Sequence, residues 1–277
     1  MLCTTQQAAD LVKNVGGKHV RVEALFGPGV DPHTYRASTK DTRLLEQAEL
    51  IVYNGLHLEG KMAEMLGKMS SMKPTLSLGD TIAGVAPEKM RHPPEFTDGI
   101  DPHLWFDVEL WSLSIPPLVQ KLGELRPAFK EEFAQQGQAY AAELGKLHAE
   151  CKATLAAIPR EQRILVTAHD AFGYFGAAYD VEVRGLQGIS TASDVSIQHV
   201  NELVKLLVER KIKAIFVESS VAPENFRNVI AGCAAEGHTV VVGGELFSDA
   251  MGPADTPEGT YAGMIRHNLR LISTALK

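Results

Sequence analysis

The tripeptide Asp-Pro-His occurs twice in this chain of 277 residues, and each copy places a histidine two residues after a carboxylate. The first copy, in GPGVDPHTYRAS, ends at His33, and the second, in DPHLWFDV, ends at His103. Proline fixes its own φ and restricts the residue before it, so the backbone that leads into each histidine is stiff. The aspartate can accept a hydrogen bond from a nearby backbone N–H, or from the imidazole nitrogen that does not bind a metal.

Two more polar residues stand where strands are expected to end. His169 closes the apolar run ILVTAH, and Asp249 lies in the loop after TVVVGG. Ligands of open α/β sheets bind beyond the carboxyl ends of the strands, so these side chains can converge. Three imidazoles and one carboxylate would suit Zn²⁺ or Mn²⁺. The intervals between them are long and no short metal motif is present, so spacing alone leaves open that the four are unrelated.

Three further residues are candidates for supporting such a site. Glu218 ends the run AIFVE, and we expect its carboxylate to accept a hydrogen bond from a ligand histidine and so orient that ring. Asp170 follows His169 directly, and His57 lies in NGLHLEGKM near the expected edge of the cleft. For His57, plain packing is the alternative to a supporting role.

Composition excludes several classes of protein. The formal net charge is -7, which argues against general binding of nucleic acid or of anionic membranes. The three cysteines, Cys3, Cys151 and Cys233, are far apart and form no CxxC pair, so neither a disulfide framework nor a cysteine zinc site is expected. No apolar run approaches the ~20 residues that span a bilayer, and the first residues do not form a signal-peptide pattern. These features fit a cytosolic protein or one whose targeting segment has been removed.

Short apolar runs alternate with helical patterns along the chain, which predicts an α/β fold. The expected strands cover residues 19–26, 50–55, 163–170 and 214–220 and the run TVVVGG, while residues 79–99 are expected to form a surface loop. Residues 128–158 contain no proline and many helix formers, which predicts one rigid helix of ~45 Å. We therefore expect two α/β lobes, residues 1–127 and 159–277, each with a central mainly parallel sheet, joined by this helix. The alternative is a long surface helix within a single domain.

Several motifs together give the chain a resemblance to a known family. They are GPGVDPHTY, AELIVYNGLHLE, DPHLWFDV, VTAHDAFGYF, GLQGISTAS, IFVESS and GGELFSDAMG with EGTYAGMIRHN. In order and over nearly the whole chain, they resemble the cluster A-I substrate-binding proteins of zinc and manganese ABC transporters (TroA-like, ZnuA/PsaA family). The resemblance implies two α/β lobes joined by one long rigid helix, with the metal between them. It implies four ligands in this sequence, His33, His103, His169 and Asp249.

The resemblance also implies a function. It predicts a monomeric, extracytoplasmic or periplasmic solute-binding protein, not an enzyme, that takes one Zn²⁺ or Mn²⁺ per chain and delivers it to an ABC transporter permease. Membrane association through a removed or lipidated N-terminus is part of this expectation. Some manganese-specific relatives have Glu where this chain has His169, and zinc-specific relatives often carry a histidine-rich loop, whereas residues 79–99 hold only His92. Metal preference therefore stays open.

Two other functions compete with transport. A zinc-dependent hydrolase would need an open coordination position, a substrate pocket and a general base, for which Glu218 or Asp170 could serve. A surface adhesin of the same fold is the second alternative, and it does not exclude metal binding.

Overall fold

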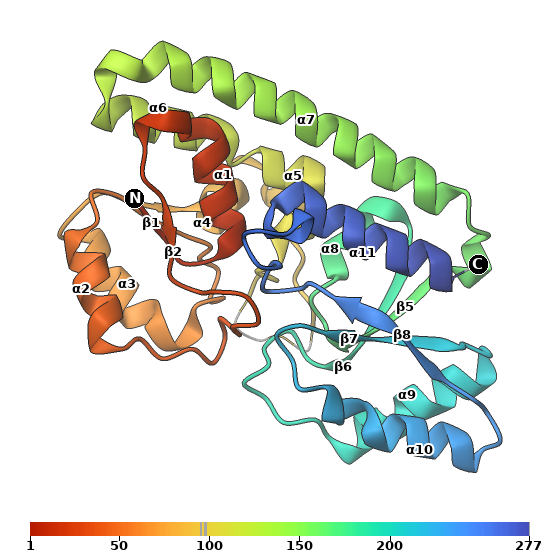
Figure 1. The fold of residues 1–277 in the computed structure, drawn as a ribbon. Helices are drawn as coiled ribbons and strands as arrows, with labels where there is room; N and C mark the ends of the chain where they lie inside the picture. The colour runs from red at the N-terminus through yellow and green to blue at the C-terminus, as the bar shows by residue number, and fades with distance from the viewer. Residues whose placement is uncertain (95, 97–98, 277) are drawn as a thin grey trace.

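Two sheets of four parallel strands organise the chain in the computed structural model, which describes residues 1–94, 96 and 99–276 (Figure 1). The first sheet has the order β2-β1-β3-β4 and the second has the order β6-β5-β7-β8, with every neighbouring pair parallel. The strands are β1 (Leu2–Cys3), β2 (Glu23–Ala24), β3 (Ile51–Tyr53), β4 (Thr75–Ser77), β5 (Ile164–His169), β6 (Glu182–Gln187), β7 (Ala214–Glu218) and β8 (Val241–Leu246). The predicted fold class is confirmed, and the two sheets repeat one strand order.

Helices connect the strands and cover the sheets (Figure 1). The α-helices are α1 (Gln6–Gly16), α2 (Thr39–Gln47), α3 (Ala63–Ser70), α4 (Leu78–Val85), α5 (Val108–Ser112), α6 (Ile115–Leu125), α7 (Lys130–Ala156), α8 (Gly173–Tyr179), α9 (Ile197–Glu209), α10 (Arg227–Ala235) and α11 (Tyr261–Ala275). Short 3-10 helices occupy Gly17–His19, Gly60–Met62, Pro87–Lys89, Leu104–Phe106, Pro127–Phe129, Arg160–Gln162, Pro223–Phe226 and Pro257–Gly259. Among the described residues, no helix combines the length and the apolar character needed to cross a membrane.

Helix α7 is the long helix that the sequence predicts. It has 27 residues and extends about 40 Å along one side of the molecule, beside both sheets (Figure 1). Its buried residues recur every three or four positions, which puts them on one face. They are Phe133, Gly137, Tyr140, Leu144, Leu147, Cys151 and Leu155. This face contacts α1, α5 and α6 from the first half of the chain and α8 and α11 from the second.

The two halves also pack directly against each other. One continuous cluster of buried apolar side chains contains residues from both, from Cys3 in β1 to Leu276 after α11. Across the seam, the rings of Phe106 and Phe172 stack with centroids 4.2 Å apart, and Trp111 lies 6.2 Å from Tyr261. The halves are therefore joined by a shared core as well as by α7.

Some local predictions were wrong. The expected surface loop at residues 79–99 begins inside helix α4, because Ser77 caps that helix and Leu78 and Ile82 are buried on one face. Residues 95, 97 and 98 of that segment lie outside the described residues. The strand expected at 19–26 is reduced to β2, preceded by the 3-10 turn Gly17–His19. Cys3 is buried in β1.

The shared face of α7 leads to a stability prediction. Leu144 is 1% exposed and contributes to the core that both halves share. We expect Leu144→Ala to lower the free energy of unfolding by about 2–5 kcal/mol, because it removes buried methyl groups and leaves a cavity. Urea unfolding in metal-free buffer measures the change. The exposed Lys152 on the same helix provides the control, and Lys152→Ala should stay within about 0.5 kcal/mol of the original protein. Equal stabilities of the two variants would contradict this assignment of the core.

Candidate metal centre

Four donor side chains from distant parts of the sequence meet in the seam between the two halves. His33 lies in the loop after β2, and His103 comes just before the 3-10 helix Leu104–Phe106. His169 is the last residue of β5, and Asp249 lies in the loop after β8. One ligand atom of each lies within 4.8 Å of the others, and each residue is at most 3% exposed. The structure thus brings together the four residues that the sequence singled out.

Three of four separations between donor atoms match the edges of a small tetrahedron, and the fourth is slightly longer. His33 Nε2 lies 3.3 Å from His103 Nε2 and 3.8 Å from Asp249 Oδ2. Asp249 Oδ1 lies 3.3 Å from His103 Nε2, and Asp249 Oδ2 lies 3.4 Å from His169 Nε2. Four bonds of 2.0–2.2 Å to one Zn²⁺ give tetrahedral edges of about 3.3–3.6 Å. The cluster can therefore hold one metal ion.

Several of these atoms have no hydrogen-bond partner in the part of the chain that the structure describes. His169 Nε2 and both carboxylate oxygens of Asp249 are buried and unpaired. An unsatisfied buried polar atom costs about 1–3 kcal/mol, and a charged one costs more. A cation in their midst would satisfy all of them at once, because it accepts electron pairs from each donor.

Carboxylates at Nδ1 of two of the histidines determine that Nε2 is the ring nitrogen available to a metal ion. Asp101 Oδ1 accepts a hydrogen bond from His103 Nδ1 at 2.8 Å and from the backbone N–H of His103 at 3.0 Å. Glu218 Oε2 lies 2.5 Å from His169 Nδ1, while Glu218 Oε1 accepts from the backbone N–H of His169 at 2.7 Å. Both rings therefore carry a proton on Nδ1 and turn Nε2 toward the cluster.

Asp31, in the first Asp-Pro-His segment, acts differently from Asp101. Its Oδ1 accepts a hydrogen bond from the backbone N–H of His33 at 2.9 Å. Its Oδ2 accepts from Thr34 Oγ1 at 2.7 Å and from Thr191 Oγ1, in the other half of the chain, at 2.6 Å. Asp31 therefore holds the backbone at His33 and also ties the two halves together beside the site.

Strand order explains why His169 and Glu218 meet. In the order β6-β5-β7-β8, the chain reverses its direction of winding between β5 and β7, and ligand sites of parallel sheets form at such points. His169 and Glu218 are the last residues of these two neighbouring strands. The carboxyl edge of the second sheet thus supplies both a donor and its supporting carboxylate.

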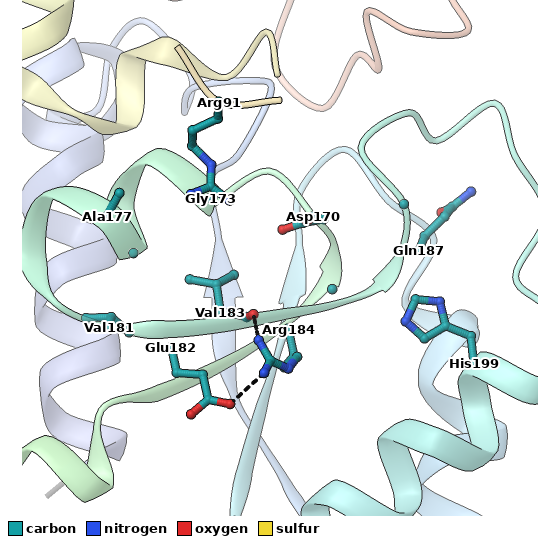
Figure 2. A pocket seen from close by; sticks show the side chains of 13 residues that line it. Arg91, Asp170, Gly173, Ala177, Val181, Glu182, Val183, Arg184, Gln187 and His199 are labelled. Carbon is teal, nitrogen blue, oxygen red and sulfur yellow. Dashed lines mark hydrogen bonds and ion pairs between the residues drawn. The ribbon is translucent and has the colours of Figure 1, made fainter. Parts of the chain in front are cut away.

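Two of the candidate supporting residues lie elsewhere. Asp170 lines a cavity of about 570 Å³ together with Arg91 and Gln187, and the lining contains none of the four donor residues (Figure 2). Burial and repulsion from Asp101 raise the pKa of Asp170 to about 6. His57 is exposed, has a left-handed backbone with φ of 64°, and borders a different cavity. The structure therefore does not bring His57 to the donor cluster.

Sequence reasoning missed contacts that come from distant segments. Arg91, in the expected surface loop, places its Nε 3.5 Å from Asp101 Oδ2, behind His103. Gln7, in helix α1, donates to the backbone of the loop that carries Asp249. Neither residue stands in a motif or at a strand end, so no local signal could have identified it.

The charges of the cluster shift its pKa values in opposite directions. Burial lowers the pKa of His33 to about 4, although Asp249 opposes the shift. Burial also disfavours the charged form of His103, but the hydrogen bond to Asp101 and the negative charge of Asp249 outweigh it and raise the pKa of His103 to about 9. Burial acts likewise on His169, yet Glu218 and Asp249 raise its pKa well above the usual range. For Asp249, burial is outweighed by the neighbouring imidazoles, which hold its pKa well below the usual range.

Fold and site together define a class of protein. It is a two-lobed α/β protein with a buried set of three histidines and one aspartate at the seam, able to hold one metal ion. The family model described as "ZnuA: Zinc-uptake complex component A periplasmic" matches residues 1–275. The chain therefore belongs to this family.

Individual relatives are similar to this chain over almost its full length. It is 46% identical over 276 residues to the zinc-binding protein TroA of Treponema pallidum, covering 100% of this chain and 88% of that protein. It is 45% identical over 274 residues to the manganese-binding lipoprotein MntA of Bacillus subtilis, covering 99% and 88%. The solved structure of the periplasmic zinc-binding protein TroA from Treponema pallidum superimposes with a TM-score of 0.95 at 45% identity, covering 99% of this chain and 98% of that one.

The raised pKa of His103 leads to a prediction for metal binding. In the metal-free protein, this shift contributes stability that is fully present below the ordinary pKa of 6.5 and is lost as the pH rises through about 9. A metal ion needs the same Nε2 lone pair, so binding at pH 7 should release at least one proton. The apparent affinity for Zn²⁺ should rise by about tenfold per pH unit for each proton released.

Calorimetry at pH 7 in buffers with different ionisation enthalpies measures this release. Repeating the titration at pH 6 and pH 8 follows the affinity across the interval. A pH-independent affinity with no proton release would contradict the protonated state assigned to His103.

Proposed function

We propose that this protein captures one divalent transition metal ion, Zn²⁺ or Mn²⁺, outside the cytoplasm and delivers it to the permease of an ABC transporter. The observation that carries the proposal is the convergence of His33, His103, His169 and Asp249 on one buried point. Membership of the zinc-uptake family supports it, as do relatives described as zinc-binding and manganese-binding.

The site favours a carrier over a hydrolase. Four protein donors complete a tetrahedral coordination sphere, whereas a catalytic zinc keeps one position open for water or substrate. Glu218, a candidate general base, directs both of its oxygens to His169. Asp170, the other candidate, lines a cavity whose walls include none of the donors. We therefore propose that the protein is not an enzyme.

Sequence similarity does not choose between the two metals, because the zinc-binding and manganese-binding relatives are nearly equally similar to this chain. The chemistry of the site supports Zn²⁺. Three imidazole donors and tetrahedral separations suit Zn²⁺, and sites of this kind bind Zn²⁺ more tightly than Mn²⁺. We propose that Zn²⁺ binds more tightly in solution, while availability decides which metal is carried in the cell.

Further parts of the proposal concern the whole protein. We propose lobes at residues 1–127 and 159–277 with a linking helix at 128–158, a monomer in solution, and association with the membrane through a lipidated N-terminus. The net charge of -7 supports the absence of nucleic-acid binding. Metal transport, rather than adhesion, is the role that the buried donor set supports.

Removal of the carboxylate tests the proposal. The unaltered protein should bind one Zn²⁺ per chain, and Asp249→Ala should weaken that binding at least about 100-fold, since it deletes one of four ligands. Asp255→Ala provides a matched control, because Asp255 is exposed in the same loop region. Chelator competition measures the affinity, and elemental analysis measures the stoichiometry. Metal-dependent hydrolysis of generic esters or phosphates by the unaltered protein would contradict the carrier function.

A further inference from the structure

The loop that carries Asp249 is held by side chains from the opposite half of the chain. Gln7, in helix α1, is fully buried, and its Nε2 donates to the carbonyl oxygen of Ser248 at 3.3 Å and of Asp249 at 3.2 Å. Trp105 Nε1 donates to the same Ser248 carbonyl at 3.1 Å. The backbone at Asp249 is therefore fastened directly to the half of the chain that contributes His33 and His103.

The neighbouring glutamine extends this attachment toward the end of the loop. Gln6 Nε2 donates to the carbonyl oxygen of Gly252 at 3.1 Å, and Gln6 Oε1 accepts from the backbone N–H of Met251 at 2.9 Å. On the other side of Asp249, the loop is held by Asn268 of helix α11, which belongs to the same half of the chain as Asp249. Asn268 Oδ1 accepts from the backbone N–H of Phe247, and Asn268 Nδ2 donates to the carbonyl oxygen of Phe247. The loop is therefore held by hydrogen bonds on both sides of Asp249. Gln7 is the residue that bonds the carbonyl oxygen of Asp249 itself.

An amide at position 7 suits this contact. Both groups that face Gln7 Nε2 are carbonyl oxygens, and the two N–H groups of the amide can satisfy them together. Gln7 Oε1 has no hydrogen-bond partner among the described residues, so the hydrogen bonds of this side chain are those of Nε2. Loss of these bonds would leave two buried carbonyl oxygens with fewer donors, which loosens the loop.

We propose that Gln7 is a positioning residue for the metal ion: by bonding the backbone of Ser248 and Asp249 across the seam, it holds the Asp249 carboxylate at the distance that the three imidazoles require. The inference rests on the proposed function. A ligand that is fixed in place before the ion arrives loses less entropy on binding.

A double-mutant cycle tests this role. The affinity for Zn²⁺ is measured by chelator competition in the unaltered protein, Gln7→Met, Asp249→Ala and the double variant. Gln7→Met should weaken binding by about 10-fold, at the low end of what supporting contacts contribute to metal affinity. In the Asp249→Ala background, the same change should alter the affinity less than about twofold, because the carboxylate that Gln7 positions is gone.

A second variant in the same helix separates positioning from stability. Leu11 is fully buried in α1 and belongs to the apolar core that both halves share. Leu11→Ala should lower the melting temperature and leave the affinity for Zn²⁺ within about twofold of the unaltered protein. If Gln7→Met does not fold, Trp105→Phe removes one donor to Ser248, keeps an aromatic ring, and enters the same cycle.

The outcomes are distinguishable. Equal losses from Gln7→Met in both backgrounds, or an equal loss in Leu11→Ala, would overturn the positioning role. An unaltered protein that binds Zn²⁺ together with a Gln7→Met variant of the same affinity would overturn this inference alone. An unaltered protein that binds neither Zn²⁺ nor Mn²⁺ would overturn the proposed function as well.

Discussion

A buried, ionised carboxylate is the constraint on which the rest of the structure depends. Asp249 is 3% exposed and is surrounded by the imidazoles of His33, His103 and His169. Among the described residues, neither of its carboxylate oxygens has a hydrogen-bond partner. A charge in such a place is tolerated only when an opposite charge compensates it. In the metal-free protein, protonated imidazoles supply that charge, as the raised pKa of His103 and His169 indicates. A divalent cation would replace those protons.

The surrounding structure keeps the four donors together. The halves share one apolar core, helix α7 packs against both, and hydrogen bonds from Gln6, Gln7 and Trp105 cross the seam to the loop of Asp249. Asp101 and Glu218 orient two of the rings from behind. All of these contacts are between groups of the protein, so the fold itself holds the four donors close together. Donors that are already in place favour tight binding, because less entropy is lost when the ion binds.

The sequence predicted the features that have a local pattern. The long helix was found by its length and composition, and strands β3, β5 and β7 by their apolar runs. Strands β4 and β6 were missed, because β4 is only three residues long and β6 contains Arg184 and Gly185 within its six. The four donor residues were candidates from their strand ends and from the Asp-Pro-His repeat, but their wide spacing gave no proof of proximity, and only the resemblance singled them out as ligands.

Supporting residues were predictable only in part. Glu218 ends the strand beside His169, and the order of strands brings such ends together. Asp170 is adjacent to His169 in sequence, yet successive side chains at a strand point in opposite directions, so Asp170 lines another cavity. Gln7 and Arg91 contact residues that are far away in the sequence. Tertiary contacts of that kind produce no periodicity or motif from which they could be predicted.

Anomalous diffraction at the zinc edge from crystals of the zinc-loaded protein tests the central claim most directly. The account predicts one anomalous peak in the seam, bonded at about 2.0–2.2 Å to Nε2 of His33, His103 and His169 and to a carboxylate oxygen of Asp249. A peak elsewhere, or a zinc ion with water in place of one of these four ligands, would contradict it.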